Sequence, residues 1–414
     1  MSIEKNWENL LRDPALLEAE LQKYTLPNLA CSRFPYGMHP CVDAVGESIV
    51  SWMRLYQIAT SFFDSEAIFQ KFLAHQIWYL PARTHPTATV SRMKWIGKLY
   101  ATACILDDLF DDSPSGQLSS ETSIPCFLEF HFIMFWTYPK STRPLLQKLL
   151  DSIDDPALRQ SIAEHFDCLL AKAEKLPGSE YPGTVSALAS GFRDLWCQAS
   201  GDSPEEWGLC FITDIQNFLL GLMQEAKNRE RHSMPSIPNY ITMRRNTGAM
   251  HMAVGSSTMY VTNCYIPYEL YFSSDVQQLL TDCSDATNWT NDIYSIPKEL
   301  KKGDFHNLVW LICKEENCSL TEAAQKVADM VEEKCNSVLQ IKAKLEKETP
   351  PQHRTAMGTM IEKNLFHIRS FIVYHQTSPR YMSVVRARMD EAAENNGQGS
   401  NEPLVPDFQG GSYF

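Results

Sequence analysis

Residues 291–299 read NDIYSIPKE, and their spacing is the most informative feature of this 414-residue chain. Asn291, Ser295 and Glu299 stand at positions i, i+4 and i+8, so a helix would place all three oxygen-bearing side chains on one face. Amide, hydroxyl and carboxylate oxygens suit Mg²⁺, whereas zinc prefers histidine and cysteine. The segment therefore predicts a magnesium site on a helix.

A second acidic cluster lies far upstream, where residues 107–112 read DDLFDD. Asp107 and Asp111 are one helical turn apart and Asp108 lies on the flank, and carboxylates this close repel one another unless a cation neutralises them. Acidic runs on helices are usually solvated faces. The apolar run 100–106 leads directly into this one, which indicates a buried helix that directs its last carboxylates into a site.

Together the clusters resemble the aspartate-rich motif and the (N/D)Dxx(S/T)xx(K/R)E motif of class I terpene cyclases, specifically of the microbial single-domain type. Residues 240–248, YITMRRNTG, resemble the diphosphate-sensor segment of that family, and residues 303–309, GDFHNLV, resemble the stretch after its second metal motif. Arg380 and Tyr381 resemble its RY pair. The matching segments follow the family's order.

The resemblance implies an all-α fold, a single-domain helical bundle around a central active-site cavity. Apolar spacing in the chain is mostly helical, as in residues 327–333. We expect the catalytic domain to span residues 1–390. Residues 391–414 are polar and rich in Gly and Asn, which predicts a disordered C-terminal tail.

The resemblance also implies three Mg²⁺ ions held between two sides of the cavity. Asp107 is the leading ligand on the first side, and Asp108 and Asp111 either ligate or orient it. A further ion is held by the helical ladder on the second side. The implied metal ligands are Asp107, Asp108, Asp111, Asn291, Ser295 and Glu299.

Arg244 is the implied diphosphate sensor, because a guanidinium can hold two phosphate oxygens in one planar fork. Its neighbour Arg245 remains an alternative; on a helix the two side chains point about 100° apart, so only one faces the site. Thr247 is the implied linker and Gly248 the effector, which presents its backbone carbonyl. Further implied diphosphate donors are Lys298, Arg380 and Tyr381.

Ionisation of an allylic diphosphate leaves a carbocation, which requires an apolar cavity whose aromatic faces stabilise positive charge and exclude water. Tyr100 lies two helical turns before Asp107 on roughly the same face, so we expect it in the cavity wall. Trp289 and Trp310 are further candidates. Most other aromatic residues are expected to be ordinary core.

The resulting functional prediction is Mg²⁺-dependent ionisation and cyclisation of a linear prenyl diphosphate, with geranylgeranyl diphosphate favoured over farnesyl diphosphate because the chain is somewhat long for the family. A chain-elongating prenyl diphosphate synthase would carry a second DDxxD motif in place of the ladder. A non-catalytic helical protein that binds isoprenoid diphosphates is a third hypothesis, against which the intact ligand set argues. The DxDD motif of protonation-initiated cyclisation is absent from the sequence.

Composition limits the other possibilities. A net charge of −13 and a pI near 5.4 argue against a nucleic acid or anionic membrane partner. The twelve cysteines form no CxxC pair, and no segment has the length and apolarity of a membrane-spanning helix or signal peptide. We therefore expect a cytoplasmic protein. The family resemblance implies a monomer or homodimer.

Overall fold

The computed structural model describes residues 13–29, 31–111, 186–231 and 233–381, with single positions between 130 and 171. Every regular element in these ranges is a helix and none is a strand, so the all-α prediction is confirmed. None of the described helices is long and apolar enough to cross a membrane. The helices are α2 (Pro14–Leu21), α3 (Val42–Leu55), α4 (Ile58–Ser61), α5 (Glu66–Leu73), α6 (Tyr79–Thr84), α7 (Val90–Asp111), α11 (Ala187–Asp202), α12 (Glu205–Glu230), α13 (Ile237–Thr247), α14 (Met250–Val254), α15 (Ser256–Thr262), α16 (Tyr268–Tyr271), α17 (Ser274–Lys302), α18 (Leu308–Glu315), α19 (Leu320–Glu348), η1 (Pro351–His353) and α20 (Arg354–Thr377).

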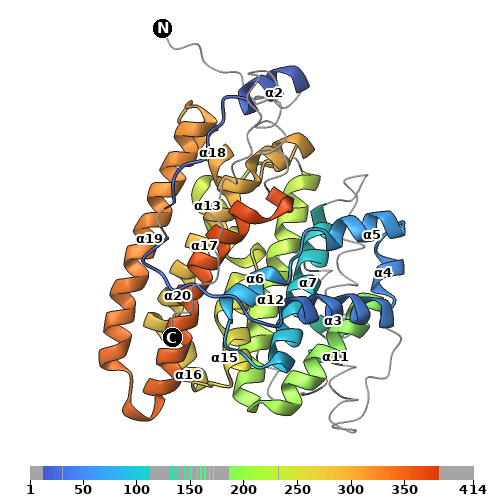
Figure 1. Ribbon diagram of the computed structural model, residues 1–414, viewed down its shortest axis with the longest axis vertical. Coiled ribbons are helices and arrows are strands. Elements are labelled where there is room, and N and C mark those ends of the chain that lie inside the picture. Colours follow the sequence, from blue (N-terminus) through green and yellow to red (C-terminus); the bar gives the residue numbers. More distant parts are fainter. Residues whose placement is uncertain are drawn as a thin grey trace.

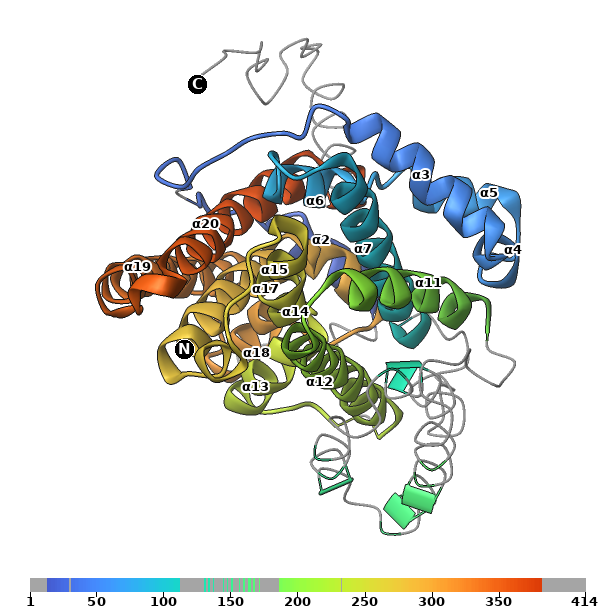
Figure 2. The ribbon, with the colours of Figure 1, turned by 90° about the horizontal axis from the view of Figure 1, so that it is seen from below.

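Helix α17 packs against α13, α14, α18, α19 and α20, and Figure 1 shows the long helices α17, α19 and α20 side by side. Figure 2 shows α12 and α13 on one side of α17 and α19 and α20 on the other. Most residues of α17 between Val276 and Pro297 are buried, because neighbours cover the helix on several sides. A helix in this position brings its polar ladder into the interior of the bundle.

Helix α7 supplies the second wall and packs against α3, α6 and α11. Its Trp95 is fully buried and donates from Nε1 to the carbonyl oxygen of Leu195 at 2.9 Å. Trp95 also belongs to a buried aromatic group with Trp207, Phe211 and Tyr260. This packing fixes the middle of α7 and thereby positions the acidic cluster at the C-terminal end of the helix.

Trp289 and Trp310 are both buried, but neither lines the central cavity. The indole of Trp289 lies instead beneath the ammonium of Lys334 on α19, 5.8 Å from the ring centroid. The prediction that these two rings form cavity wall was therefore wrong. Helical periodicity places a residue on a face, but neighbouring helices decide which face meets the cavity.

Candidate active site

A cavity of about 140 Å³ lies among α6, α7, α12, α13, α14, α17 and α20. One part of its wall is polar and holds Asp107 of α7, Arg244 of α13 and Asn291 of α17, with Arg380 and Tyr381. The remaining wall is mainly apolar or aromatic. It is formed by Ile77, Leu80, Tyr100, Ala103, Cys104, Phe218, Met250, Met252, Ala253, Phe371 and Tyr374.

The first acidic cluster lies at the C-terminal end of α7, where the helix dipole disfavours negative charge. Burial raises the pKa of Asp107, and the neighbouring carboxylate of Asp108 raises it further. Burial also acts on Asp108, but the charge and hydrogen bond of Arg380 outweigh it and lower the pKa of Asp108. Asp111 ends α7, and its side chain lies outside the described part of the chain.

The second cluster forms the predicted ladder on α17. Asn307 bridges two of its members: its Nδ2 donates to Glu299 Oε2 at 2.7 Å and lies 3.5 Å from Ser295 Oγ. Burial raises the pKa of Glu299 to about 7, and the carboxylates of Asp304 and Asp292 add to the shift. Ser295 and Glu299 therefore share one face, as the i, i+4 spacing predicted.

The donor set of the two clusters fits a hard divalent cation. Every candidate ligand offers oxygen, which Mg²⁺ prefers. Burial is the main cause of the raised pKa values of Asp107 and Glu299, neighbouring carboxylates add to it, and nearby cations give only partial compensation. A divalent ion would supply that compensation.

Arg244 lines the cavity and is anchored from α17. Its Nε donates to Asp292 Oδ1 at 3.1 Å and its Nη2 to Asn291 Oδ1 at 2.6 Å. Asp292 in turn accepts from the Tyr240 hydroxyl at 2.7 Å and from the Leu308 amide at 3.0 Å. Our sequence analysis missed this orienting role of Asp292, although the residue stands inside the quoted motif.

Arg245 points elsewhere. Its Nε and Nη2 donate to the two carboxylate oxygens of Asp285, each at 2.8 Å. Lys334 of α19 also pairs with Asp285, at 3.2 Å. Arg245 is thus part of an ion-pair group outside the cavity, and only Arg244 of the adjacent pair faces the candidate site.

The helical backbone is interrupted beside the cavity, between α13 and α14. Gly248 ends α13, and Ala249 has a φ of 54°, a left-handed conformation that is strained for a residue with a side chain. A Cβ on Gly248 would lie 2.0 Å from Oδ1 of Asn288, so this position requires glycine. Thr247 lines the cavity beside it, and its buried Oγ1 has no hydrogen-bond partner.

The RY pair follows directly after α20 and lines the cavity. Arg380 donates from Nη2 to Asp108 Oδ1 at 3.1 Å, and Tyr381 Oη accepts from Nδ2 of Asn291 at 3.0 Å. These contacts connect the pair to both oxygen-rich clusters. Lys298 is half-buried on α17 and is not among the cavity-lining residues, although its charge helps to lower the pKa of Asp108.

Tyr100 lines the cavity as expected. Its hydroxyl lies 3.3 Å from Nε2 of His367 on α20, and His367 directs Nδ1 to the carbonyl oxygen of Lys363 at 2.8 Å. Because that carbonyl can only accept, Nδ1 carries the proton and the Tyr100 hydroxyl donates to Nε2. The Tyr100 hydroxyl on the apolar side of the cavity is thus already engaged.

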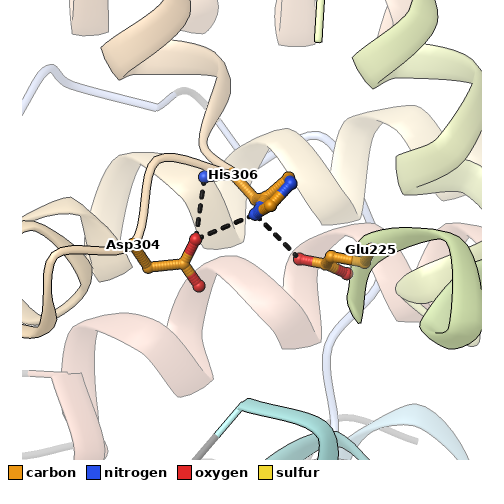
Figure 3. Close-up of side chains that lie close together, drawn as sticks. All are labelled: Glu225, Asp304 and His306. Atoms are coloured by element: carbon orange, nitrogen blue, oxygen red, sulfur yellow. Dashed lines mark hydrogen bonds and ion pairs between the residues drawn. The ribbon is translucent and has the colours of Figure 1, made fainter. Parts of the chain in front are cut away.

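A separate polar group lies beside the ladder (Figure 3). Nδ1 of His306 lies 3.0 Å from Asp304 Oδ1 and 3.9 Å from Glu225 Oε1, and these three residues are close enough to share a metal ion. Arg229 already pairs with both carboxylates, at 2.8 and 3.2 Å. We therefore interpret the group as an ion-pair cluster that joins α12 to the segment after α17, and assign His306 a structural role.

Comparisons with known proteins agree with this arrangement. The family model described as terpene synthase family 2, C-terminal metal binding, matches residues 148–337, a little under half of the chain. Alpha-gurjunene synthase of Marchantia polymorpha is 26% identical over 306 residues, 69% of this chain and 70% of that protein. Pentalenene synthase of Streptomyces avermitilis is 22% identical over 355 residues, 84% of this chain and 91% of that protein.

A third relative is the (+)-T-muurolol synthase of Roseiflexus castenholzii, described as (2E,6E)-farnesyl diphosphate cyclizing. It is 27% identical over 213 residues, 49% of this chain and 65% of that protein. Among solved structures, hedycaryol synthase in complex with HEPES has a TM-score of 0.63 at 17% identity, covering 86% of this chain and 99% of that chain. The linalool/nerolidol synthase from Streptomyces clavuligerus has a TM-score of 0.61 at 14% identity, covering 84% of this chain and 100% of that chain. These two structures share the fold.

The helical bundle, its cavity and the two oxygen-rich clusters are the features expected of a class I terpenoid synthase. The family model and the relatives support a class I terpene cyclase, an enzyme of the lyase class, and the matched domain is described as metal-binding.

Proposed function

We propose that the enzyme binds a linear prenyl diphosphate with Mg²⁺, ionises it, directs cyclisation of the resulting carbocation and releases diphosphate. One observation carries this proposal. Asp107 of α7 and Asn291 of α17 line the same cavity, with Arg244 and Arg380 beside them and an apolar wall beyond. The polar region suits the diphosphate and the apolar region suits the hydrocarbon chain.

The proposed metal ligands are the six residues of the two clusters, including Asp111, whose side chain the structure does not describe. Bound Mg²⁺ would stabilise the negative charge that develops on the departing diphosphate. Arg244 and Arg380 donate N–H groups to diphosphate oxygens in the planar geometry that guanidinium provides. Lys298 and Tyr381 are proposed as additional donors.

The rest of the cavity protects the carbocation. Its lining is largely apolar, and the rings of Tyr100, Phe218, Phe371 and Tyr374 supply π faces that favour positive charge. The left-handed backbone at Ala249 lies next to the polar region, and we assign Thr247 and Gly248 the linker and effector roles. Water exclusion by this wall limits premature quenching of the cation.

We propose farnesyl diphosphate as the substrate in place of geranylgeranyl diphosphate. The preference for the longer chain rested on sequence length, and the relatives give it no support. The Roseiflexus relative is described as cyclising farnesyl diphosphate.

Other features remain predictions. The catalytic domain is proposed to span residues 1–390, and the expected tail, 391–414, lies outside the described residues. A monomer or homodimer is likewise proposed from the family resemblance, and a cytosolic location from the sequence.

The test is incubation of purified protein with geranyl, farnesyl or geranylgeranyl diphosphate, with Mg²⁺ or with EDTA, followed by gas chromatography and mass spectrometry. We expect a cyclic C15 product from farnesyl diphosphate that appears only with Mg²⁺. Longer diphosphates formed after addition of isopentenyl diphosphate would instead identify an elongating enzyme. Absence of product from every substrate would favour the non-catalytic binding protein.

A further inference from the structure

The amide group of Asn291 has an accepting face and a donating face, and each meets a different neighbour in the cavity. Its Oδ1 accepts from Nη2 of Arg244 at 2.6 Å. Its Nδ2 lies 2.9 Å from Nε2 of His375 and 3.0 Å from the hydroxyl of Tyr381. The rotation of this amide therefore decides whether oxygen or nitrogen faces Arg244.

His375 has its protonated nitrogen fixed by its own helix. It lies on α20 with 1% of its surface exposed, and its Nδ1 is 2.6 Å from the carbonyl oxygen of Phe371, one turn earlier. A carbonyl oxygen only accepts, so Nδ1 carries the proton and Nε2 presents a lone pair. That lone pair accepts an N–H of Asn291 and repels an amide oxygen.

The opposite rotation of the Asn291 amide would create two unfavourable contacts at once. Oδ1 would face the lone pair of His375 Nε2, and the NH₂ group would face the N–H donors of Arg244. Both neighbours thus select the same orientation. The histidine ring is itself held between aromatic side chains, with centroid distances of 4.3 Å to Tyr381 and 5.7 Å to Tyr294.

We propose that His375 is a positioning residue that orients the Asn291 amide, so that its oxygen faces Arg244 and is available as a metal ligand. This inference rests on the proposed function, because Asn291 is assigned as a ligand there. His375 acts through Asn291 and is not itself assigned as a ligand. Partners of this kind commonly orient metal-binding side chains and tune their affinity.

The experiment measures binding of Mn²⁺ in the presence of inorganic diphosphate by electron paramagnetic resonance, which needs no turnover. His375→Leu removes the lone pair, and we expect the affinity for Mn²⁺ to fall by about 10- to 100-fold. In His375→Gln, the side-chain oxygen takes a place near that of Nε2 and accepts from Asn291. We expect this variant to recover most of the affinity.

His367→Leu is the matched control. His367 is buried on the same helix and also directs Nδ1 to the carbonyl oxygen four residues earlier, at 2.8 Å, but its Nε2 meets Tyr100 and not Asn291. We expect Mn²⁺ affinity close to wild type. A second control is the Asn291→Asp background, in which two equivalent oxygens need no amide orientation and His375→Leu should cost little.

Wild-type affinity in His375→Leu would overturn the inference, and so would an equal loss in His367→Leu, because that result would point to packing. Absence of Mn²⁺ binding by the wild type would also overturn it. If circular dichroism shows that His375→Leu is unfolded, His375→Asn replaces it, since the shorter amide leaves no acceptor near Nε2. A wild type that binds Mn²⁺ but makes no terpene would reject the proposed function, while the comparison of variants would still decide the role of His375.

Discussion

Nη2 of Arg380 donates to Oδ1 of Asp108 at 3.1 Å, which joins two residues 272 positions apart in the chain. The Arg380 side chain is 9% exposed and that of Asp108 30%. The contact links the segment after α20 to the end of α7 beside the cavity. A diphosphate entering the cavity would compete with Asp108 for the same guanidinium.

Arg380→Gln should therefore weaken transition-state stabilisation. Loss of a charged donor to a developing oxyanion typically lowers the rate by about 10²- to 10³-fold, and we expect a loss of kcat/KM of that order with farnesyl diphosphate. Arg54→Gln is the control, because Arg54 forms an exposed ion pair with Glu66 of a kind that contributes little. Equal activity of the two variants would contradict the assignment of Arg380.

Arg244 and Arg245 provide a comparison between neighbours. Arg244→Lys keeps the charge but loses the planar fork, so we expect kcat/KM to fall by roughly 10²-fold or more. Arg245→Lys disturbs only the pair with Asp285, and steady-state assays should show activity within a few-fold of wild type. Thermal unfolding should confirm that both variants fold. The reverse ranking would make Arg245 the sensor.

The same pair shows where sequence reasoning ends. The i, i+4 relation of Ser295 and Glu299 was predictable because helical periodicity is local, and the contacts of Asn307 with both residues confirm their shared face. The choice between the two arginines was left open, because it depends on Asp285 and Asp292 facing α13. Asp285 and Asp292 both lie on α17. Which arginine of α13 each one contacts depends on how the two helices pack.

Residues from separate helices were harder to predict. A histidine on an apolar helix such as α20 is usually core, and nothing in the local sequence of His375 indicates contact with Asn291. The close approach of Asn288 to Gly248 depends on the distance between α13 and α17. Cavity size, and with it substrate length, is likewise a property of packing. Local patterns therefore predict the candidate site residues, whereas tertiary contacts determine how these residues are oriented.

Gly248→Ala should be damaging, because the new Cβ would lie 2.0 Å from Asn288 Oδ1. We expect the free energy of unfolding to fall by about 1–3 kcal/mol, as for other overpacked sites, with reduced turnover. Gly358→Ala is the control: it lies within α20 and its Cβ would meet nothing within 4 Å. That change should raise stability by about 0.5–1 kcal/mol. Urea unfolding of both variants checks this, and a stable, active Gly248→Ala enzyme would rule out the close approach.

Glu299 predicts a pH-dependent stability in metal-free protein. Its pKa is raised to about 7 by burial, against about 4.3 for the unfolded chain. Between these values the folded state binds more protons, so the stabilising contribution is full below the lower value and is lost as pH rises through the upper one.

Glu299→Gln keeps an acceptor for Asn307 and removes the titration. Relative to wild type, the variant should gain stability between about pH 5 and pH 8, by an amount on the order of 2 kcal/mol. Urea unfolding in EDTA at four pH values measures this difference. Parallel stability curves for the two proteins would show that Glu299 titrates normally.

Phe371 tests whether cavity size sets the substrate length. Its ring lines the cavity from α20 and is 9% exposed, so Phe371→Leu should enlarge the apolar region at a modest cost in stability, about 1–2 kcal/mol. We expect the ratio of kcat/KM for geranylgeranyl diphosphate to that for farnesyl diphosphate to increase by about 10-fold, because each additional buried carbon contributes roughly 0.8 kcal/mol. Phe69→Leu is the matched control, since Phe69 of α5 is buried away from the cavity lining. If both variants shift the ratio equally, general loosening of the bundle and not the volume of this cavity determines which diphosphate is accepted.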